Sequence, residues 1–273
     1  MNITEKVSCA HPDKIADRIA GVLVDHCYKE QEDPKCAFEV LIGHNACFVT
    51  GETSVHIPKD HVKHIAETIS GVKLKDFEYI EVPQDPILAG NQKELRCGDN
   101  GVFAGFIKPD VHKLAGAICY ELYQHYPYDG KIVLNEDTKE LTVCWSNTTE
   151  EQIRQIIPTA TSINPLGPWT GGINVDTGIT GRKLASDFYG IEKPLGGGTM
   201  HGKDLSKADC SVNIYCFLKA WDEGKDQEAI CSIGDTHVNV NGQKVPFNDI
   251  VIIAKEYIRR LGGFESLAEW GLR

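Results

Sequence analysis

The sequence predicts an α+β protein made of three similar repeats, in which helices pack on mixed or antiparallel sheets. A helical pattern of apolar residues is followed by two strand-like runs and a second helix, and this order occurs three times along the chain. The unit recurs at about 90 to 100 residues, which is typical of a repeated supersecondary unit. We place the repeats at residues 1–101, 102–165 and 166–273 and expect them to be intertwined.

The first repeat has the clearest pattern. A helix is predicted over residues 12–29, because its apolar residues fall on one face and Pro12 suits the first helical turn. A hairpin of two strands and a second helix follow, at residues 38–42, 47–50 and 60–70.

The other two repeats follow the same order. In the second repeat the first helix, the two strands and the second helix lie near Pro109, at 131–134, at 140–145 and near Thr149. In the third repeat they lie near Ser206, at 229–233, at 237–240 and near Asp249. Helices cover only one face of each hairpin, so we expect self-association through the uncovered sheet faces.

Composition argues against several classes of protein. The formal net charge of −11 disfavours binding to nucleic acid or to anionic membranes, because both need a basic face. No apolar run is long enough for a membrane helix and the N-terminal residues lack the apolar core of a signal peptide, so we expect a cytoplasmic protein. The ten cysteines include no C-x-x-C pair, which favours reduced, buried thiols over a zinc site.

The stretch from Asp176 to Asp209 carries the strongest chemical signal. Glycine-rich turns there allow the backbone to approach an anion closely, and acidic residues flank them. The cations of the stretch can neutralise several phosphates at once, and they are Arg182, Lys183, Lys203 and Lys207. This pattern predicts a polyphosphate and metal site with a nucleotide triphosphate as the ligand. The alternative is a glycine-rich surface loop with solvated lysines.

Part of the stretch matches the phosphate-binding loop of another class of nucleotidase. Residues 197–203 read G-x-x-x-x-G-K, but Asp204 stands where a Ser or Thr should hold magnesium. Residues 191–195 also do not resemble the buried parallel strand that should precede such a loop. We therefore favour a different phosphate site.

The first helices of the three repeats begin with HPDK, KPD and KDLSK, and free N–H groups at helix N-termini suit phosphate binding. We expect two of these helix starts to meet at one site.

Four motifs occur in the order HPDKIADRIAG, CGDNG, DTGITGRK and GGGTMHGKDLSKAD. With them the chain resembles the methionine adenosyltransferase family, also called S-adenosylmethionine synthetases, from Glu5 to about Ile233. The resemblance implies a fold of three similar α+β repeats. It also implies attack by the sulfur of L-methionine on C5′ of ATP, with release of triphosphate that the same site hydrolyses. A thioether has no proton to lose, so this chemistry needs no general base.

The resemblance also implies roles for individual residues. His11 of HPDK would stabilise the leaving 5′-oxygen, and Asp13 would hold Mg²⁺ together with Asp209 of SKAD, with two ions expected in each site. Lys14 would be a phosphate-binding or a structural charge. His11 on its own is equally consistent with a helix-capping histidine. The triphosphate would be bound by Arg182, Lys183, Lys203 and Lys207, with Arg182 assisting its hydrolysis.

The remaining site residues are implied by motif matches outside the phosphate loops. Asp129 and Lys131 resemble a pair beside the ribose and phosphates, although a D-G-K turn before a strand is also a common structural element. Trp169 falls near the family's adenine-stacking Phe, with a core or interface tryptophan as the alternative. Ile233 would contact adenine and Glu39 would be a K⁺ ligand. The acids near methionine or ribose would be Glu52, Asp99 and Asp176.

The chain departs from the family pattern at several points. It is shorter than familiar members between the first repeat's sheet and CGDNG, which implies a shortened lid over the site, and at the C-terminus. Cys9 and Ala10 replace a Glu-Gly pair before HPDK, and His201 replaces a small residue in the glycine loop. The family also implies a homodimer with shared active sites. A non-catalytic ATP- or S-adenosylmethionine-binding homologue, a triphosphatase and an enzyme for another thioether remain alternatives.

Overall fold

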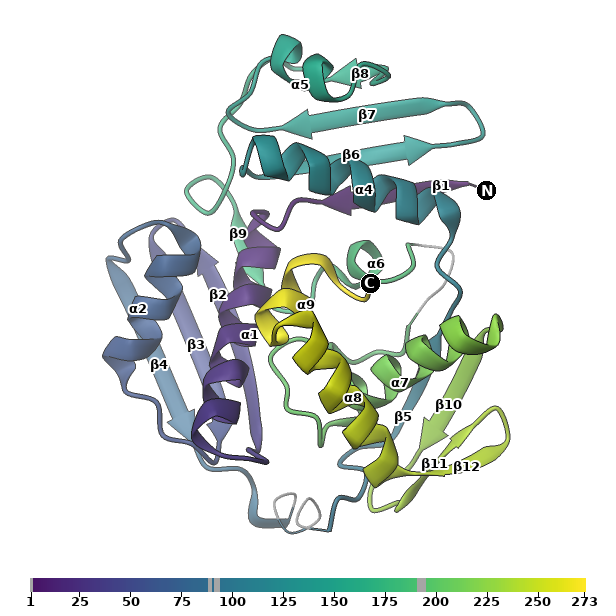
Figure 1. Ribbon diagram of the computed structural model, residues 1–273. Coiled ribbons are helices and arrows are strands. Elements are labelled where there is room, and N and C mark those ends of the chain that lie inside the picture. The colour runs from purple at the N-terminus through teal and green to yellow at the C-terminus, as the bar shows by residue number, and fades with distance from the viewer. Residues whose placement is uncertain (1, 88–89, 91–93, 191–194) are drawn as a thin grey trace.

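The computed structural model describes residues 2–87, 90, 94–190 and 195–273, and these form three four-stranded sheets with helices packed against them (Figure 1). The sheets are mixed or antiparallel, so the predicted α+β fold is confirmed. Two segments discussed above lie partly outside the described residues, at 88–89, 91–93 and 191–194. They are residues 83–101, where the resemblance implies a shortened lid, and residues 191–195.

The helices and strands fall close to the predicted positions. In the described residues the helices are α1 (Pro12–Glu30), α2 (Lys59–Ser70), α4 (Asp110–His125), α5 (Glu150–Ile156), α6 (Leu184–Asp187), α7 (Ala208–Glu223), α8 (Phe247–Leu261) and α9 (Phe264–Trp270). The strands are β1 (Ile3–Val7), β2 (Cys36–Gly43), β3 (Ala46–Thr53), β4 (Asp76–Val82), β5 (Gly101–Gly105), β6 (Gly130–Asn135), β7 (Glu140–Trp145), β8 (Ser162–Ile163), β9 (Thr177–Ile179), β10 (Gln227–Cys231), β11 (His237–Val240) and β12 (Gln243–Pro246).

Each four-stranded sheet contains one of the three predicted hairpins, the next strand after that hairpin in the chain and one strand from elsewhere. The sheet orders are β4-β3-β2-β9, β1-β6-β7-β8 and β12-β11-β10-β5. Strand β1 therefore joins the sheet of the middle hairpin, β9 joins that of the first hairpin, and β5 pairs with β10. The three units share strands, so none of them is a contiguous piece of the chain.

Helix α1 connects the three units. His11 caps its N-terminus by accepting the backbone N–H of Asp13 at Nδ1, and Pro12 occupies its first turn. Its apolar side packs against β2 and α9, and Ile19 and Leu23 have no exposed surface. The start of α1 also contacts β9, where a Cβ on Gly178 would lie 1.9 Å from the Pro12 carbonyl oxygen. The sequence therefore needs glycine at that position for β9 to reach the helix start.

The core has two parts. The larger part lies around α1, α7 and α8, beneath the sheets of the first and third hairpins. The smaller part lies under the middle sheet and is built around Trp145, whose indole N–H donates to the Tyr126 carbonyl at 2.9 Å. No helix in the described part of the chain is long and apolar enough to cross a membrane.

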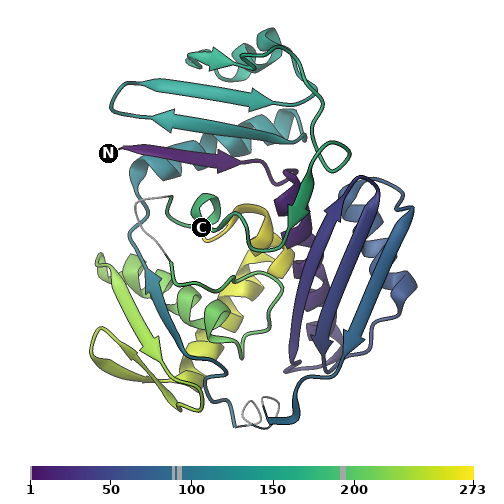
Figure 2. The same ribbon diagram turned by 180° about the vertical axis from the view of Figure 1, so that it is seen from behind.

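The sheet faces that the helices leave uncovered carry apolar side chains. Figure 2 shows the first sheet from this side, with its strands in front of α1 and α2. Its exposed apolar side chains are Leu41, Phe48, Ile80, Val82 and Ile179. We call these five residues the outer apolar face. A cluster of this kind on a sheet marks a surface that pairs with another protein surface.

Candidate active site

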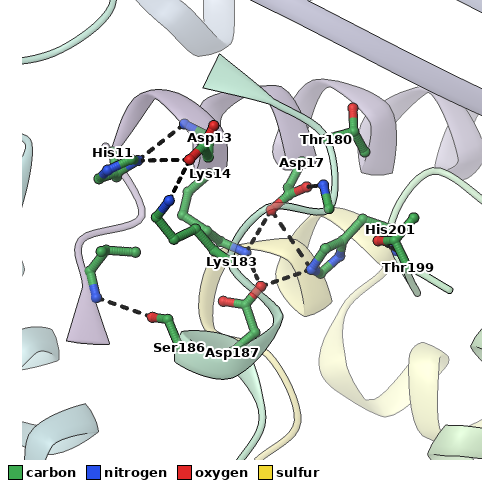
Figure 3. A network of polar contacts seen from close by, with 12 residues as sticks. His11, Asp13, Lys14, Asp17, Thr180, Lys183, Ser186, Asp187, Thr199 and His201 are labelled. Carbon is green, nitrogen blue, oxygen red and sulfur yellow. Dashed lines mark hydrogen bonds and ion pairs between the residues drawn. The ribbon is translucent and has the colours of Figure 1, made fainter. Parts of the chain in front are cut away.

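The first functional group forms where α1 begins (Figure 3). His11 accepts the Asp13 backbone N–H at Nδ1 (3.1 Å), so the neutral imidazole carries its proton on Nε2. Burial, together with the nearby Lys183 charge, lowers the pKa of His11 to about 4, so the ring is neutral near pH 7. No described residue makes a hydrogen bond with Nε2. The capping role and an outward-facing N–H donor are therefore compatible.

Asp13 receives hydrogen bonds from β9 and from the turn that follows it. Its Oδ1 accepts the Ile179 backbone N–H at 2.8 Å, and Lys183 donates to its Oδ2. The guanidinium of Arg182 lies 3.7 Å from Oδ1. Burial alone would raise the pKa of Asp13, but the bonds from Lys183 and Ile179 lower it below the usual value. Asp13 is thus a carboxylate surrounded by cations at the positive end of a helix.

Two further acids lie near this helix start. Asp129 accepts the Gly172 backbone N–H at 2.9 Å, and burial raises its pKa to about 6, with Asp176 adding to the rise. Asp176 also acts electrostatically on His11. Lys131 is half exposed and pairs with Glu5 at 2.6 Å. We name the set of His11, Asp13, Asp129, Lys131, Asp176, Arg182 and Lys183 the helix-1 group.

A network of buried charges supports the helix-1 group from below (Figure 3). The ammonium of Lys14 lies 2.6 Å from Asp187 and 3.1 Å from Asp17, and all three side chains are at most 1% exposed. Asp187 also contacts Nε2 of His201 at 2.9 Å. This burial and pairing favour a structural charge, one of the two roles that the sequence left open for Lys14. Asp17 accepts the Gly181 backbone N–H at 2.7 Å, which fixes the turn carrying Arg182 and Lys183.

The second functional group forms where α7 begins. Lys203 donates to Asp209 at 2.6 Å, and Lys207 lies 2.5 Å from Asp204. Asp204 has no exposed surface and accepts the Cys36 backbone N–H at 2.7 Å. The residue that breaks the G-x-x-x-x-G-K match is therefore an anchor to β2. We name the set of Lys203, Lys207 and Asp209 the helix-7 group.

Other predicted residues lie around the helix-7 group. Glu39 projects from the uncovered side of β2, where burial raises its pKa and the Lys203 charge opposes the rise. Glu52 is paired in register with Ala37, the residue bridged to Lys203. Asp99 and Ile233 lie together at the Cys231 end of β10, because the Asp99 carbonyl accepts from Cys231 and Asn100 accepts the Ile233 backbone N–H.

The two groups are separate within one chain. The helix-1 group meets β2 through the pairing of Ile179 with Leu41, whereas Lys203 is bridged to Ala37. These positions are four residues apart on β2, or about 13 Å at the usual rise of a strand. Within one chain Asp13 and Asp209, which the sequence analysis assigned to one magnesium site, have different cationic partners, Arg182 and Lys183 for Asp13 and Lys203 for Asp209. Trp169 is half-buried, and its indole N–H donates to Asn164 at 3.1 Å.

Sequence reasoning missed Asp17, Asp187 and Asp204, which support the two groups. Asp17 follows Lys14 by three residues in α1, a spacing that brings side chains together on one helical turn, and Asp204 precedes Lys207 by three in the turn before α7. That spacing was the available signal. The partnership of Lys14 with Asp187 spans 173 residues and has no local signature.

One cluster in the described residues has the geometry to hold a metal ion, namely Asp17, Asp187 and His201. Its donor atoms are fully buried, and the Lys14 ammonium already lies within 3.1 Å of both carboxylates. The ammonium therefore supplies the positive charge there. Asp13 and Asp209 are more accessible carboxylates, each facing a lysine, and they suit a hard cation better.

Two family models match the parts of the chain that carry the helix-1 and helix-7 groups. Residues 1–83 match the N-terminal domain and residues 170–219 match the C-terminal domain of S-adenosylmethionine synthetase. These segments hold α1 with the first hairpin, and the turn before α6 with most of α7.

Several individual proteins are also similar. The S-adenosylmethionine synthase of Bradyrhizobium sp. (strain ORS 278) is 30% identical, with 77% of this chain and 70% of that protein covered. The synthase of Acholeplasma laidlawii is 30% identical, with 77% and 71% covered. A solved structure of an unusual S-adenosylmethionine synthetase from Campylobacter jejuni has the same fold, with a TM-score of 0.78, 18% identity and coverage of 98% and 93%. By this similarity the chain belongs to the S-adenosylmethionine synthetase family, and its matches cover about 70% of the length of these two synthases.

Proposed function

We propose that the protein is a methionine adenosyltransferase that forms S-adenosylmethionine from ATP and L-methionine. The observation that carries this proposal is the helix-1 group, where a neutral imidazole with a free N–H lies beside Lys183, Arg182 and Asp13. This combination suits a reaction that expels a polyphosphate from a carbon atom. The methionine sulfur bonds to C5′, the C5′–O bond breaks, and its electron pair stays on the triphosphate.

His11 serves this step as a hydrogen-bond donor. Its Nε2–H points away from the helix cap, and a donor aimed at the leaving oxygen stabilises charge as that charge develops. The lowered pKa of His11 keeps the ring neutral over the physiological range, so its donor capacity does not change with pH there. The product is a sulfonium and no proton is released, so Asp13 and Asp129 need not act as bases.

The cations of both groups would bind the triphosphate. Lys183 and Lys203 are each held by a carboxylate, at Asp13 and Asp209, and a polyphosphate can take these ammonium groups while metal ions take the carboxylates. Bound Mg²⁺, two ions per site, would neutralise charge on the phosphate oxygens. Arg182 is exposed and can follow the triphosphate after transfer, which suits it to the hydrolysis that yields phosphate and diphosphate.

A homodimer would unite the two groups. They are separated within one chain, so we propose that the helix-1 group of one subunit faces the helix-7 group of its partner. The outer apolar face lies on the sheet that carries both β9 and the bridge to Lys203. Packing this face against a second copy would bury it and bring the groups together.

The remaining residues would hold the other parts of the substrates. Trp169 can stack on adenine, and Asp129 and Lys131 border the helix start where ribose and phosphates would lie. Glu39 would bind K⁺. The contacts to methionine, ribose and adenine would come from Glu52, Asp99, Asp176 and Ile233.

A direct assay tests the proposed function. Purified protein is incubated with ATP, L-methionine, Mg²⁺ and K⁺ while S-adenosylmethionine is followed by mass and phosphate by colorimetry, beside methionine-free samples. Methionine-dependent S-adenosylmethionine is the expected result. Phosphate release without methionine would indicate a triphosphatase instead, and nucleotide binding without turnover would indicate a regulatory homologue.

A further inference from the structure

A cavity of about 440 Å³ lies away from both functional groups, between α4, α9, the C-terminal half of α7 and the last residues of the chain. Figure 1 shows the C-terminus between α4 and α7 in this part of the molecule. The volume is within the range of small-molecule sites and suits a ligand of one or two rings. The proposed reaction uses none of the residues that line it.

One end of the cavity is cationic. Lys6 is 3% exposed, and its ammonium donates to the backbone carbonyls of Ser186 (2.7 Å) and Trp270 (3.4 Å). Lys108 donates to the Leu272 carbonyl at 2.6 Å. No carboxylate of a described residue lies within 4 Å of either ammonium group. Both cations therefore retain N–H groups that protein anions do not satisfy.

The surrounding charges do not balance these lysines. Asp187 acts on Lys6 electrostatically, but its carboxylate is shared by Lys14 and His201. Burial lowers the pKa of Lys6, and burial together with the Lys6 charge lowers the pKa of Lys108 to about 8. An anion bound in the cavity would offset the free-energy cost of keeping these two ammonium groups charged.

Three further basic residues line the cavity. His112 is neutral because burial lowers its pKa to about 3, Lys113 pairs with Asp110 at 2.9 Å, and Arg273 adds a guanidinium at the end of the chain.

The other walls are aromatic. Trp221 is 72% exposed and Tyr120 is 44% exposed, and both line the cavity with Phe217. Trp270 contacts Tyr120 edge to face, with ring centroids 5.2 Å apart. Aromatic walls of this kind bind a flat ring by stacking and edge contacts.

Gly116 keeps the cavity open from the side of α4. It lies in the interior of the helix, where glycine costs up to about 1 kcal/mol relative to alanine. A Cβ added at this position would meet no atom within 4 Å, so packing does not require glycine. Its effect is to leave the space beside the helix free.

We propose that this cavity is a second ligand site, which binds a planar aromatic anion with its ring against Trp221, Trp270 and Tyr120 and its acidic group toward Lys108 and Lys6. The ligand class follows from the two kinds of wall, because a neutral ring leaves the ammonium groups unsatisfied and a non-aromatic anion leaves the ring surfaces exposed. The site is independent of the proposed reaction.

The test is calorimetric titration with 2-naphthoate, without methionine or metal. We expect saturable binding of one molecule per chain. The neutral analogue 2-naphthamide should bind at least about tenfold more weakly, the scale of one lost charge-assisted hydrogen bond. Gly116→Leu should abolish binding by filling the space, and leucine also favours the helix, so this variant should remain folded. Lys108→Met and Trp221→Ala should each weaken binding at least about fivefold.

The controls separate this site from the active site. Lys183→Ala should bind 2-naphthoate with unchanged affinity, as should Lys75→Met, which removes a lysine elsewhere on the surface. Saturating ATP should not displace the probe. Equal affinity in Gly116→Leu and the wild type, displacement by ATP, or no measurable binding to the wild type would each overturn the proposal. None of these outcomes depends on whether S-adenosylmethionine is formed.

Discussion

The helix-1 and helix-7 groups use the same residue types but bury them to different depths. In each, an Asp in the first helical turn faces a Lys from a glycine-containing turn. The Asp13 side chain is 4% exposed and stands on a network of buried charges, whereas that of Asp209 is 15% exposed. For the proposed reaction we therefore expect the helix-1 group to be preorganised for charge developing at one atom, and the helix-7 group to bind phosphate charge.

The largest expected effect is on adenosyl transfer. Lys183→Ala and His11→Asn should each lower kcat by about 10² to 10³-fold or more, because each removes a contact to developing charge. Lys203→Ala should raise the KM for ATP more than it lowers kcat, if the helix-7 group mainly binds phosphate. Steady-state kinetics with Lys73→Ala, an 89% exposed lysine, as the control would measure this difference. Near wild-type turnover in His11→Asn would refute its role.

A charge on the outer apolar face should prevent dimerisation, and so keep the helix-1 group of one subunit from the helix-7 group of its partner, without changing a residue of either group. Phe48→Glu places a carboxylate on a half-exposed side chain of β3, so the chain should still fold but fail to dimerise. Light scattering should then report a monomer, and transfer activity should be lost. A folded monomer with full activity would show that one chain holds a complete site.

Mixing two inactive variants sharpens the same point. In a heterodimer of His11→Asn with Asp209→Asn, one of two shared sites has both groups intact and the other has both altered. Equal mixing and refolding should therefore restore about a quarter of wild-type activity, since half of the dimers are mixed and half of their sites are complete. Sites contained within single chains would restore none.

Asp17, which supports the helix-1 group, and Asp204, which supports the helix-7 group, should contribute differently to the free energy of unfolding. Asp17→Asn leaves the fully buried Lys14 with one carboxylate, which should lower the free energy of unfolding by about 3–5 kcal/mol. Asp204→Asn should cost only about 1–2 kcal/mol, because its partner Lys207 is 17% exposed and can recover water. Urea unfolding of the two variants compares these costs directly. Equal losses would mean that burial of the lysine does not set the difference.

The last expected effect is on the pH dependence of stability. The folded pKa of His11 is about 4, below its unfolded value, so its contribution to the free energy of unfolding is lost as pH falls from about 6.5 to 4. The folded pKa of Asp129 is about 6, above its unfolded value, so its contribution declines as pH rises from about 4 to 6. Each change should be about 1–3 kcal/mol.

Urea unfolding between pH 4 and pH 7 separates the two contributions. Relative to the wild type, His11→Asn should flatten the rise of stability with pH, and Asp129→Asn should flatten the fall. Matching profiles for the wild type and both variants would contradict both pKa shifts.

Much of the local structure could be predicted from the sequence. The starts of α1, α2, α4 and α8 lie within two residues of the predicted ones, because proline, capping residues and apolar periodicity act over a single turn. The three hairpins were also predicted, because their strands are close in the chain. Strands β1, β5 and β9 pair with strands that are distant in the sequence, namely β6, β10 and β2. No local sequence pattern specifies such partners.

The sequence by itself determined the chemistry of this protein: which residues can carry charge, and at which helix ends and glycine turns they stand. The tertiary structure decided which of these residues are buried as supports and which stand in the helix-1 and helix-7 groups. It buried Lys14 against Asp187, anchored Asp204 to β2 and gave Asp13 and Asp209 different cationic partners within one chain. The physical reason is that burial and pairing depend on contacts between segments far apart in the chain, such as Lys14 and Asp187 at 173 residues, whereas propensity and capping depend on the nearest few residues.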